Sequence, residues 1–266
     1  MSQIYWNNMQ LKGAKVIQLC VIVFFHGVLI IAISFCLIMS LHENKLIDTI
    51  IDRTVTQQMG DQQKVLALLN QTHTLLKPRA HFFSGQGRTS IRERFFTSSD
   101  VHLMDGKGAC GSYAGVLTRI LQRAGFESRL AQMKCEDEWG CHIVVETTID
   151  GKLAVLDPMD NLAFKNKGGS LASFSEVGER WPYFQQQTPN GYPAAYQYED
   201  VRYTNWGKIP VLMPLIKTVL NVFMGSNADE VSVRSYVLNI YFVYLILLTF
   251  IYAILILATF NFVRKL

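Results

Sequence analysis

The sequence predicts an α+β domain held between two membrane-spanning helices. Two long apolar runs lie near the ends of the 266-residue chain, a helical apolar pattern follows Cys110, and two strand-like segments flank Asp150-Gly151. Half of the residues are apolar. That content is enough for one domain with its own core in addition to membrane segments.

The first apolar run, residues 16–41, contains no Asp, Glu, Lys or Arg and is long enough to cross a bilayer. A cleavable signal peptide is the alternative. The run is longer than the apolar region of such a peptide, and no Ala-x-Ala-like cleavage site precedes His42. We therefore expect a retained transmembrane helix. The second run, residues 236–263, is rich in Leu, Ile and Tyr and predicts a second span.

The charges orient these two spans. All 21 acidic residues lie between Glu43 and Glu230, where Lys and Arg balance them. The net charge of +4 comes from four basic residues at the two ends, Lys12, Lys15, Arg264 and Lys265. Because short basic flanks stay on the cytoplasmic side, we expect residues 1–15 and 264–266 to be cytoplasmic and the region between the spans to be extracytoplasmic. The balanced charge of that region gives no support for nucleic-acid binding.

The region between the spans divides into three parts. Residues 42–105 form a membrane-proximal helical region, whose apolar residues recur at three- and four-residue steps until Pro78 ends the pattern. Residues 106–205 form the central domain. Residues 206–235 form an interfacial linker, because the apolar run 209–223 is too short to span a membrane and contains two prolines.

Cys110 begins the best-defined helical pattern of the chain. The apolar face of this helix comprises Ala114, Val116, Leu117, Ile120, Leu121 and Ala124. Gly125 is a suitable stop. Cys110 therefore lies in the first turn, where the unpaired backbone N–H groups and the positive end of the helix dipole favour the nucleophilic thiolate. A buried structural cysteine behind a glycine turn is the alternative.

The segments 143–149 and 152–156 predict a β-hairpin, because the intervening Asp150-Gly151 is a strong two-residue turn signal. This turn pairs Ile149 with Lys152. Both segments are apolar on both faces, as expected of a sheet covered by other elements.

That register makes His142 and Asp157 neighbours. Asp157 falls opposite Val144, so that His142 lies diagonally from it on the same face, about 7–8 Å away at Cα. A slip of one residue would separate the two side chains onto opposite faces. In the expected register, Asp157 orients His142, and His142 serves Cys110 as a base.

The cysteines of the central domain fit an oxidising compartment. Cys135 and Cys141 are close enough in sequence for a short-loop disulfide, which would leave Cys110 as the free thiol. A zinc site formed by these three cysteines and His142 is an alternative, although the spacing matches no common ribbon or finger. Thiol redox chemistry is a further alternative, although the pair is not a Cys-x-x-Cys motif.

Three segments together resemble the core of the transglutaminase-like superfamily, relatives of papain-type cysteine proteases. They are Gly108-Ala-Cys-Gly-Ser-Tyr-Ala with the following Gly125-x-x-x-Arg129, then Cys141-His-Ile-Val-Val-Glu, then Leu156-Asp-Pro-Met. The resemblance covers residues 106–161. It implies a papain-like α+β fold, in which a nucleophile helix packs on an antiparallel sheet, and a catalytic triad of Cys110, His142 and Asp157. We expect no cofactor and no metal.

Two positions depart from the family pattern. Many relatives carry an aromatic residue directly after the histidine, where this chain has Ile143, so the aromatic wall is missing or rebuilt. Relatives also use an upstream Trp or Gln side chain to bind the oxyanion, for which Gln86 is a weak candidate. Loss of one oxyanion donor costs on the order of 10²- to 10³-fold in rate.

The sequence therefore predicts a membrane-anchored extracytoplasmic thiol enzyme that cleaves or transfers an amide or acyl group through a thioester. The alternative is a catalytically weak or inactive module that binds a peptide or glycan or supports a cell-envelope assembly. The expected partners are the lipid bilayer and a peptide, protein or glycan-associated substrate of the envelope, which follows from location alone. The balanced charge of the outer domain does not narrow the substrate.

Overall fold

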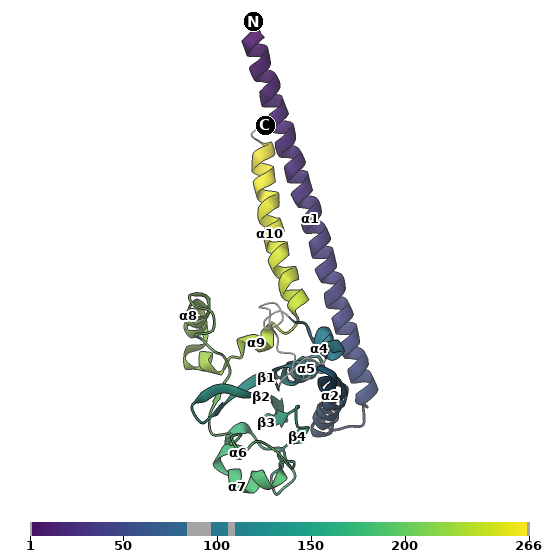
Figure 1. The fold of residues 1–266 in the computed structure, drawn as a ribbon, viewed down its shortest axis with the longest axis vertical. Helices are drawn as coiled ribbons and strands as arrows, with labels where there is room; N and C mark the ends of the chain where they lie inside the picture. Colours follow the sequence, from purple (N-terminus) through teal and green to yellow (C-terminus); the bar gives the residue numbers. More distant parts are fainter. Residues whose placement is uncertain (1, 84–96, 106–109, 265–266) are drawn as a thin grey trace. The chain divides into compact units, whose positions relative to one another are not determined.

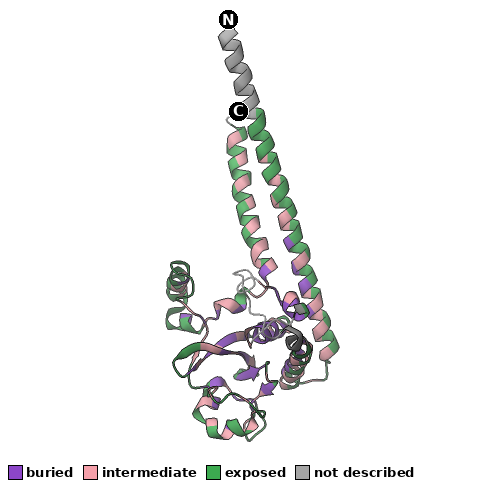
Figure 2. Ribbon diagram, in the orientation of Figure 1, coloured by how far each residue is buried: buried purple, intermediate pink, exposed green. Residues whose placement is uncertain are grey.

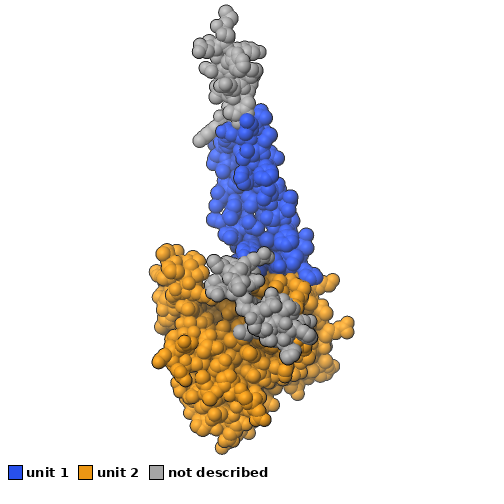
Figure 3. All heavy atoms as spheres, viewed as in Figure 1, with its two compact units in different colours: residues 1–42, 240–266 blue, residues 43–239 orange. Residues whose placement is uncertain are grey.

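The computed structural model describes residues 2–83, 97–105 and 110–264. The chain divides into two compact units, coloured separately in Figure 3. One unit contains residues 1–42 and 240–266, and the other contains residues 43–239. The second unit includes the membrane-proximal helices and the linker as well as the central domain.

The first unit consists of two apolar helices (Figure 1). Helix α1 covers Ser2–Thr54 and α10 covers Ile240–Val263, and both are long and apolar enough to cross a membrane. His26 on α1 lies 3.0 Å from the hydroxyl of Thr259 on α10. A polar side chain within a span is expected to pair in this way with a neighbouring helix. The prediction that the second span begins at residue 236 is wrong by four residues, because Tyr236 ends a separate short helix.

The membrane-proximal part of the second unit is helical, as the apolar periodicity predicts. It contains the end of α1, then α2, Asp61–Phe83, and α4, Ser99–Asp105. The prediction that Pro78 ends the helical pattern is wrong, because α2 continues past Pro78 to Phe83. A proline inside a helix removes one backbone hydrogen bond. Burial of Leu69 and Leu76 on the same helix offsets that cost by packing α2 against the core.

Helix α5, Cys110–Arg123, confirms the helix expected after Cys110. It ends before Gly125, whose φ of +92° is a left-handed conformation that favours glycine. Its predicted apolar face is buried. Arg123 near its end pairs with Asp48 of α1, with an N–O distance of 2.6 Å, and thereby ties α5 to the membrane-proximal helix.

A five-stranded antiparallel sheet carries the remaining core in the order β4-β3-β2-β1-β5. Its strands are β1, Ser128–Cys135; β2, Glu138–Ile149; β3, Lys152–Asp157; β4, Leu162–Ala163; and β5, Val201–Arg202. The predicted hairpin is confirmed, with Ile149 opposite Lys152 and positive φ at both Asp150 and Gly151. This turn fixes the register on which the site depends.

Both faces of the sheet are buried, as Figures 1 and 2 show. On one face Val145 and Leu156 pack with residues of α2 and α5. On the other face Val144 and Val155 pack with aromatic residues from the segment after β4. The structure is therefore α+β, with helices and aromatic loops covering an antiparallel sheet.

Short elements complete the second unit. They are α6, Phe174–Glu179; α7, Trp181–Phe184; the 3₁₀ helix η1, Gln185–Gln187; α8, Leu212–Met224; the 3₁₀ helix η2, Gly225–Glu230; and α9, Val233–Tyr236. Helix α6 begins with a capping box between Ser173 and Glu176. Gly178 on α6 lies so close to the carbonyl oxygen of Tyr198 that a Cβ could not fit there. The contact fixes the tyrosine-rich segment against the sheet.

Candidate active site

His142 and Asp157 form a buried hydrogen-bonded pair. His142 Nε2 lies 2.7 Å from Asp157 Oδ2, and both side chains are fully buried. Strand β2 presents His142 and β3 ends with Asp157, in the hairpin register that the sequence predicts. A second carboxylate oxygen, Oδ1, accepts a hydrogen bond of 3.2 Å from the backbone N–H of Met159. The carboxylate is thus held in one orientation and fixes the imidazole.

Cys110 completes this group from the first position of α5. Its thiol is free and half-buried. His142 Nδ1 has no hydrogen-bond partner of standard geometry among the described residues. Cys110 nevertheless lies near enough to act on the imidazole through a side-chain interaction and through charge. The structure therefore brings together all three residues that the sequence predicts for the site.

The electrostatic state of His142 follows from its neighbours. Burial by itself would lower the pKa of His142, but hydrogen bonding and the charges of Asp157 and Cys110 outweigh burial and raise this pKa from 6.5 to about 10. Burial and then the charge of Asp157 raise the pKa of nearby Asp160. The pair therefore holds its proton on the imidazole near neutral pH.

Stability should depend on pH in a direction set by His142. A raised pKa means that the folded protein holds a proton that the unfolded chain releases, so the stabilisation is complete below pH 6.5 and is lost as pH rises through about 10. We expect the unfolding temperature of the full-length protein in detergent micelles to fall across this window. Thermal unfolding of His142→Gln should fall less, whereas His73→Gln should follow the wild type. An identical fall in His142→Gln would contradict the assignment.

Three tyrosines enclose the His142–Asp157 pair. The ring of Tyr196 stacks on the imidazole, with centroids 4.3 Å apart and an interplanar angle of 12°. The hydroxyl of Tyr192 donates to Asp157 Oδ2 at 2.9 Å and lies 2.9 Å from the hydroxyl of Tyr198. Burial raises the pKa of Tyr192, so the phenol stays a donor.

The tyrosines answer the absence of an aromatic residue at position 143. Tyr196 supplies an aromatic wall from a segment more than fifty positions further along the chain. Sequence reasoning noted the aromatic content of this segment but missed these roles. A high density of tyrosines before a short strand is the signal available, but it does not indicate which ring contacts the histidine.

Replacement of Tyr196 should separate the contribution of the ring from that of the hydroxyl. A stacked aromatic pair contributes about 0.5–1.5 kcal/mol beyond area burial. We expect Tyr196→Ala to lower the free energy of unfolding by at least this amount and Tyr196→Phe to leave it nearly unchanged, because the phenyl ring retains the stacking. Chemical denaturation of both variants checks this. An equal loss in Tyr196→Phe would assign the effect to the hydroxyl instead.

The disulfide between Cys135 and Cys141 closes the loop that precedes His142. It joins the end of β1 to β2 and leaves Cys110 free, as the sequence allows. Oxidised sulfurs cannot serve as thiolate ligands, so the structure does not support zinc held by the three cysteines and His142.

One group of side chains could hold a cation. His142, Asp157 and Asp160 place ligand atoms within 4.8 Å of one another. His142 and Asp157 already bond to each other, however, so a cation at this position would have to replace that hydrogen bond. The arrangement fits proton transfer better than metal binding.

The surroundings of the thiol are known in part. Gln86, the candidate oxyanion donor, and Gly108 and Ala109 lie outside the described residues. Gly111 follows Cys110, and a Cβ built there would lie 3.2 Å from Ile143 Cδ1. Its open side therefore faces protein atoms.

Comparison with known proteins gives no assignment. No protein-family model, curated protein or solved structure matches this chain. The functional argument therefore depends on the geometry of the site.

Proposed function

We propose that the protein is a membrane-anchored, papain-like thiol enzyme that cleaves or transfers an amide or related acyl group. The observation that carries this proposal is the buried His142–Asp157 hydrogen bond of 2.7 Å next to a free cysteine at a helix start. The order Cys110, His142, Asp157 on one helix and two strands supports it, because the same order characterises the transglutaminase-like superfamily that the sequence resembles.

In the proposed reaction, Cys110 Sγ attacks the carbonyl carbon while His142 holds the thiol proton. The carbon–nitrogen bond then breaks, the proton passes from His142 to the departing amine, and the acyl group remains on sulfur as a thioester. Water or a second amine attacks the thioester and gives an acid or a new amide. Asp157 keeps the imidazole oriented and stabilises its positive charge in each step.

The two apolar helices support the proposed location at a membrane. Basic residues flank both candidate spans on the terminal sides, which favours cytoplasmic termini and an extracytoplasmic enzyme domain. Helix α8 supports an interfacial linker, because apolar side chains such as Leu215, Val222 and Phe223 are exposed on it. A disulfide in the enzyme domain suits an oxidising compartment.

A second candidate is a binding module that has retained the triad without strong catalysis. Full burial of His142 beneath Tyr196 favours it, since a substrate then reaches the thiol before the imidazole. Chemistry at Cys110 distinguishes the two candidates.

Acyl transfer to Cys110 from an activated ester tests the proposal. Full-length protein in neutral detergent micelles is mixed with p-nitrophenyl acetate, and the cysteine peptides are analysed by mass spectrometry. The enzyme predicts a rapid release of p-nitrophenolate, followed by slower turnover, with the acetyl group on Cys110. Acetylation of Cys110 no faster than that of a small free thiol would favour the binding module.

A further inference from the structure

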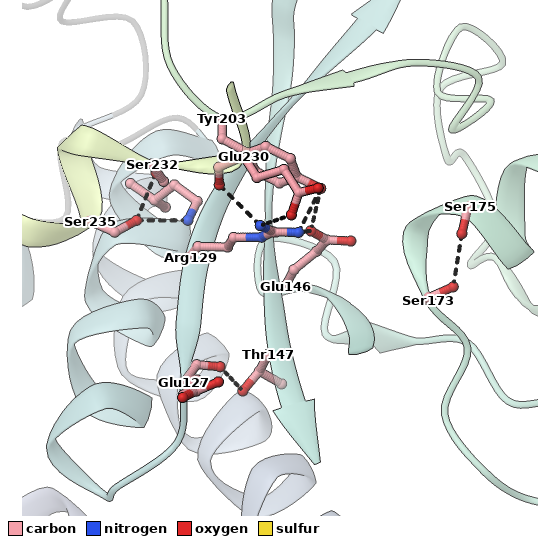
Figure 4. Close-up of polar contacts among 11 residues, drawn as sticks. Glu127, Arg129, Glu146, Thr147, Ser173, Ser175, Tyr203, Glu230, Ser232 and Ser235 are labelled. Carbon is pink, nitrogen blue, oxygen red and sulfur yellow. Dashed lines mark hydrogen bonds and ion pairs between the residues drawn. The ribbon is translucent and has the colours of Figure 1, made fainter. Parts of the chain in front are cut away.

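Arg129 fastens the chain before α9 to the sheet (Figure 4). It lies 3.1 Å from the buried Glu146 carboxylate and donates to the hydroxyl of Tyr203 at 3.0 Å. Its Nη1 donates to the carbonyl oxygen of Glu230 at 3.0 Å. The Arg129 guanidinium is therefore fully engaged in holding structure, and the end of η2 is fixed to β1.

A second set of bonds fixes α9 itself (Figure 4). The backbone N–H of Leu130 donates to Ser235 Oγ at 2.8 Å, and this hydroxyl donates to Ser232 Oγ at 2.8 Å. Both serines are buried. Arg234 lies between them in sequence, so its backbone position is determined from both sides.

Arg234 reaches the first turn of α5. Its Nη2 donates to the carbonyl oxygen of Gly111 at 3.2 Å. A Cβ at Gly111 would lie 3.4 Å from Arg234 Nη1, in tight contact. Because Gly111 follows Cys110, a positive charge is held beside the proposed nucleophile.

Arg202 places a second positive charge on the same side of the sheet. It lies opposite Gln132 of β1, which in turn lies opposite Ile143 of β2. Residues paired across strands share one face. Arg202 Nε donates to Gln132 Oε1 at 3.2 Å, and its guanidinium carbon is 5.0 Å from the ring centroid of Trp139. Arg202 thus lies in the row that contains the Ile143 side chain contacting the first turn of α5.

Lys208 joins these two arginines. Its side chain is exposed in the turn after β5. Partial desolvation, and then the positive charges of Arg234 and Arg202, lower the pKa of Lys208. The three side chains therefore share one electrostatic environment, in which their like charges oppose one another and an added anion would be stabilising.

We propose that Arg234, Arg202 and Lys208 bind a carboxylate of the acyl donor, so that the substrate is an acidic peptide or an amide with a carboxylate near its scissile bond. This inference rests on the proposed function, because it takes Cys110 as the nucleophile. Guanidinium groups bind carboxylates through paired charge-assisted hydrogen bonds, and the lysine adds a mobile point charge. The balanced overall charge of the domain conceals this local preference.

Two alkylating reagents of similar size test the proposal through charge alone. Iodoacetate is an anion and iodoacetamide is neutral, and each is reacted with the full-length protein in neutral detergent micelles. The rate at Cys110 is followed by mass spectrometry of its peptide. The rate ratio of iodoacetate to iodoacetamide is then divided by the ratio for free cysteine. We expect this corrected ratio to be roughly tenfold above unity, because a cleft lined by one sign of charge concentrates the opposite ion. It should fall toward unity in about 1 M NaCl.

Substitutions assign the effect to the cluster. Arg234→Gln and Arg202→Gln should each lower the corrected ratio severalfold, and Lys208→Gln should lower it without affecting folding, since Lys208 is exposed. Lys152→Gln removes an exposed lysine at the hairpin turn and should leave the ratio unchanged. A wild-type ratio near unity, or no change in any of the cluster variants, would overturn the proposal. The iodoacetamide rate alone reports on the thiol enzyme, so a failure of the proposed function remains distinguishable.

Discussion

Replacement of Cys110 by alanine is expected to abolish acyl turnover while the protein stays folded. Removal of the nucleophile from a comparable triad costs on the order of 10⁴- to 10⁶-fold in kcat. The thiol is half-buried at the first position of α5, so removal of its sulfur leaves the core of the domain intact. With p-nitrophenyl acetate, the rapid phase should disappear and no acetylated Cys110 peptide should form. Circular dichroism and thermal unfolding should match the wild type.

Cys20 provides the matched control, because it is a free cysteine in the first candidate span. Cys20→Ala should retain the rapid phase in full. Persistence of that phase in Cys110→Ala would remove Cys110 from the mechanism and, with it, the proposed enzyme.

Replacement of Asp157 by asparagine should produce the second large loss. The amide keeps the size of the side chain but exchanges one acceptor oxygen for a donor nitrogen, so it cannot hold the imidazole as the carboxylate does at 2.7 Å. Loss of the orienting carboxylate in a related triad costs on the order of 10⁴-fold in kcat. We expect turnover of p-nitrophenyl acetate to fall to near background, together with the raised pKa of His142, which NMR titration of the imidazole would report.

Asp150→Asn is the control for this substitution. Asp150 lies in the hairpin turn at φ +50°, a conformation that asparagine tolerates. The control should keep both activity and the His142 titration. Unchanged activity in Asp157→Asn would mean that Asp157 serves only structure.

The helix and the hairpin could be predicted because each depends on local physics. The apolar face after Cys110 has a 3.6-residue period, and Asp150-Gly151 adopts the positive φ values that a tight hairpin turn requires. From the turn, the register follows by counting, and the register places His142 and Asp157 on one face.

Other features could not be predicted because they depend on distant contacts. Tyr196 stacks on His142 only after the long segment following β4 folds over the sheet, held partly by the close approach of Gly178 to Tyr198. The continuation of α2 past Pro78 similarly depends on tertiary packing rather than on propensity.

The basic cluster illustrates the same limit. Arg202 and Arg234 are separated by 32 positions, and neither lies in the segments that resemble the transglutaminase-like superfamily. Strand pairing places Arg202 beside Gln132, and the bonds of Ser232 and Ser235 place Arg234 beside Gly111. Overall charge balance cannot reveal a concentration of charge that the fold creates.

The alkylation rate of Cys110 as a function of pH tests the central claim most directly, in full-length protein and in His142→Ala. A thiolate stabilised by the imidazolium predicts a rate that reaches its plateau well below about pH 8.5, the range of a free thiol, and a plateau that shifts to that range in the variant. A rate that follows an ordinary thiol in both proteins would contradict the account, because Cys110 and His142 would then not act as a pair.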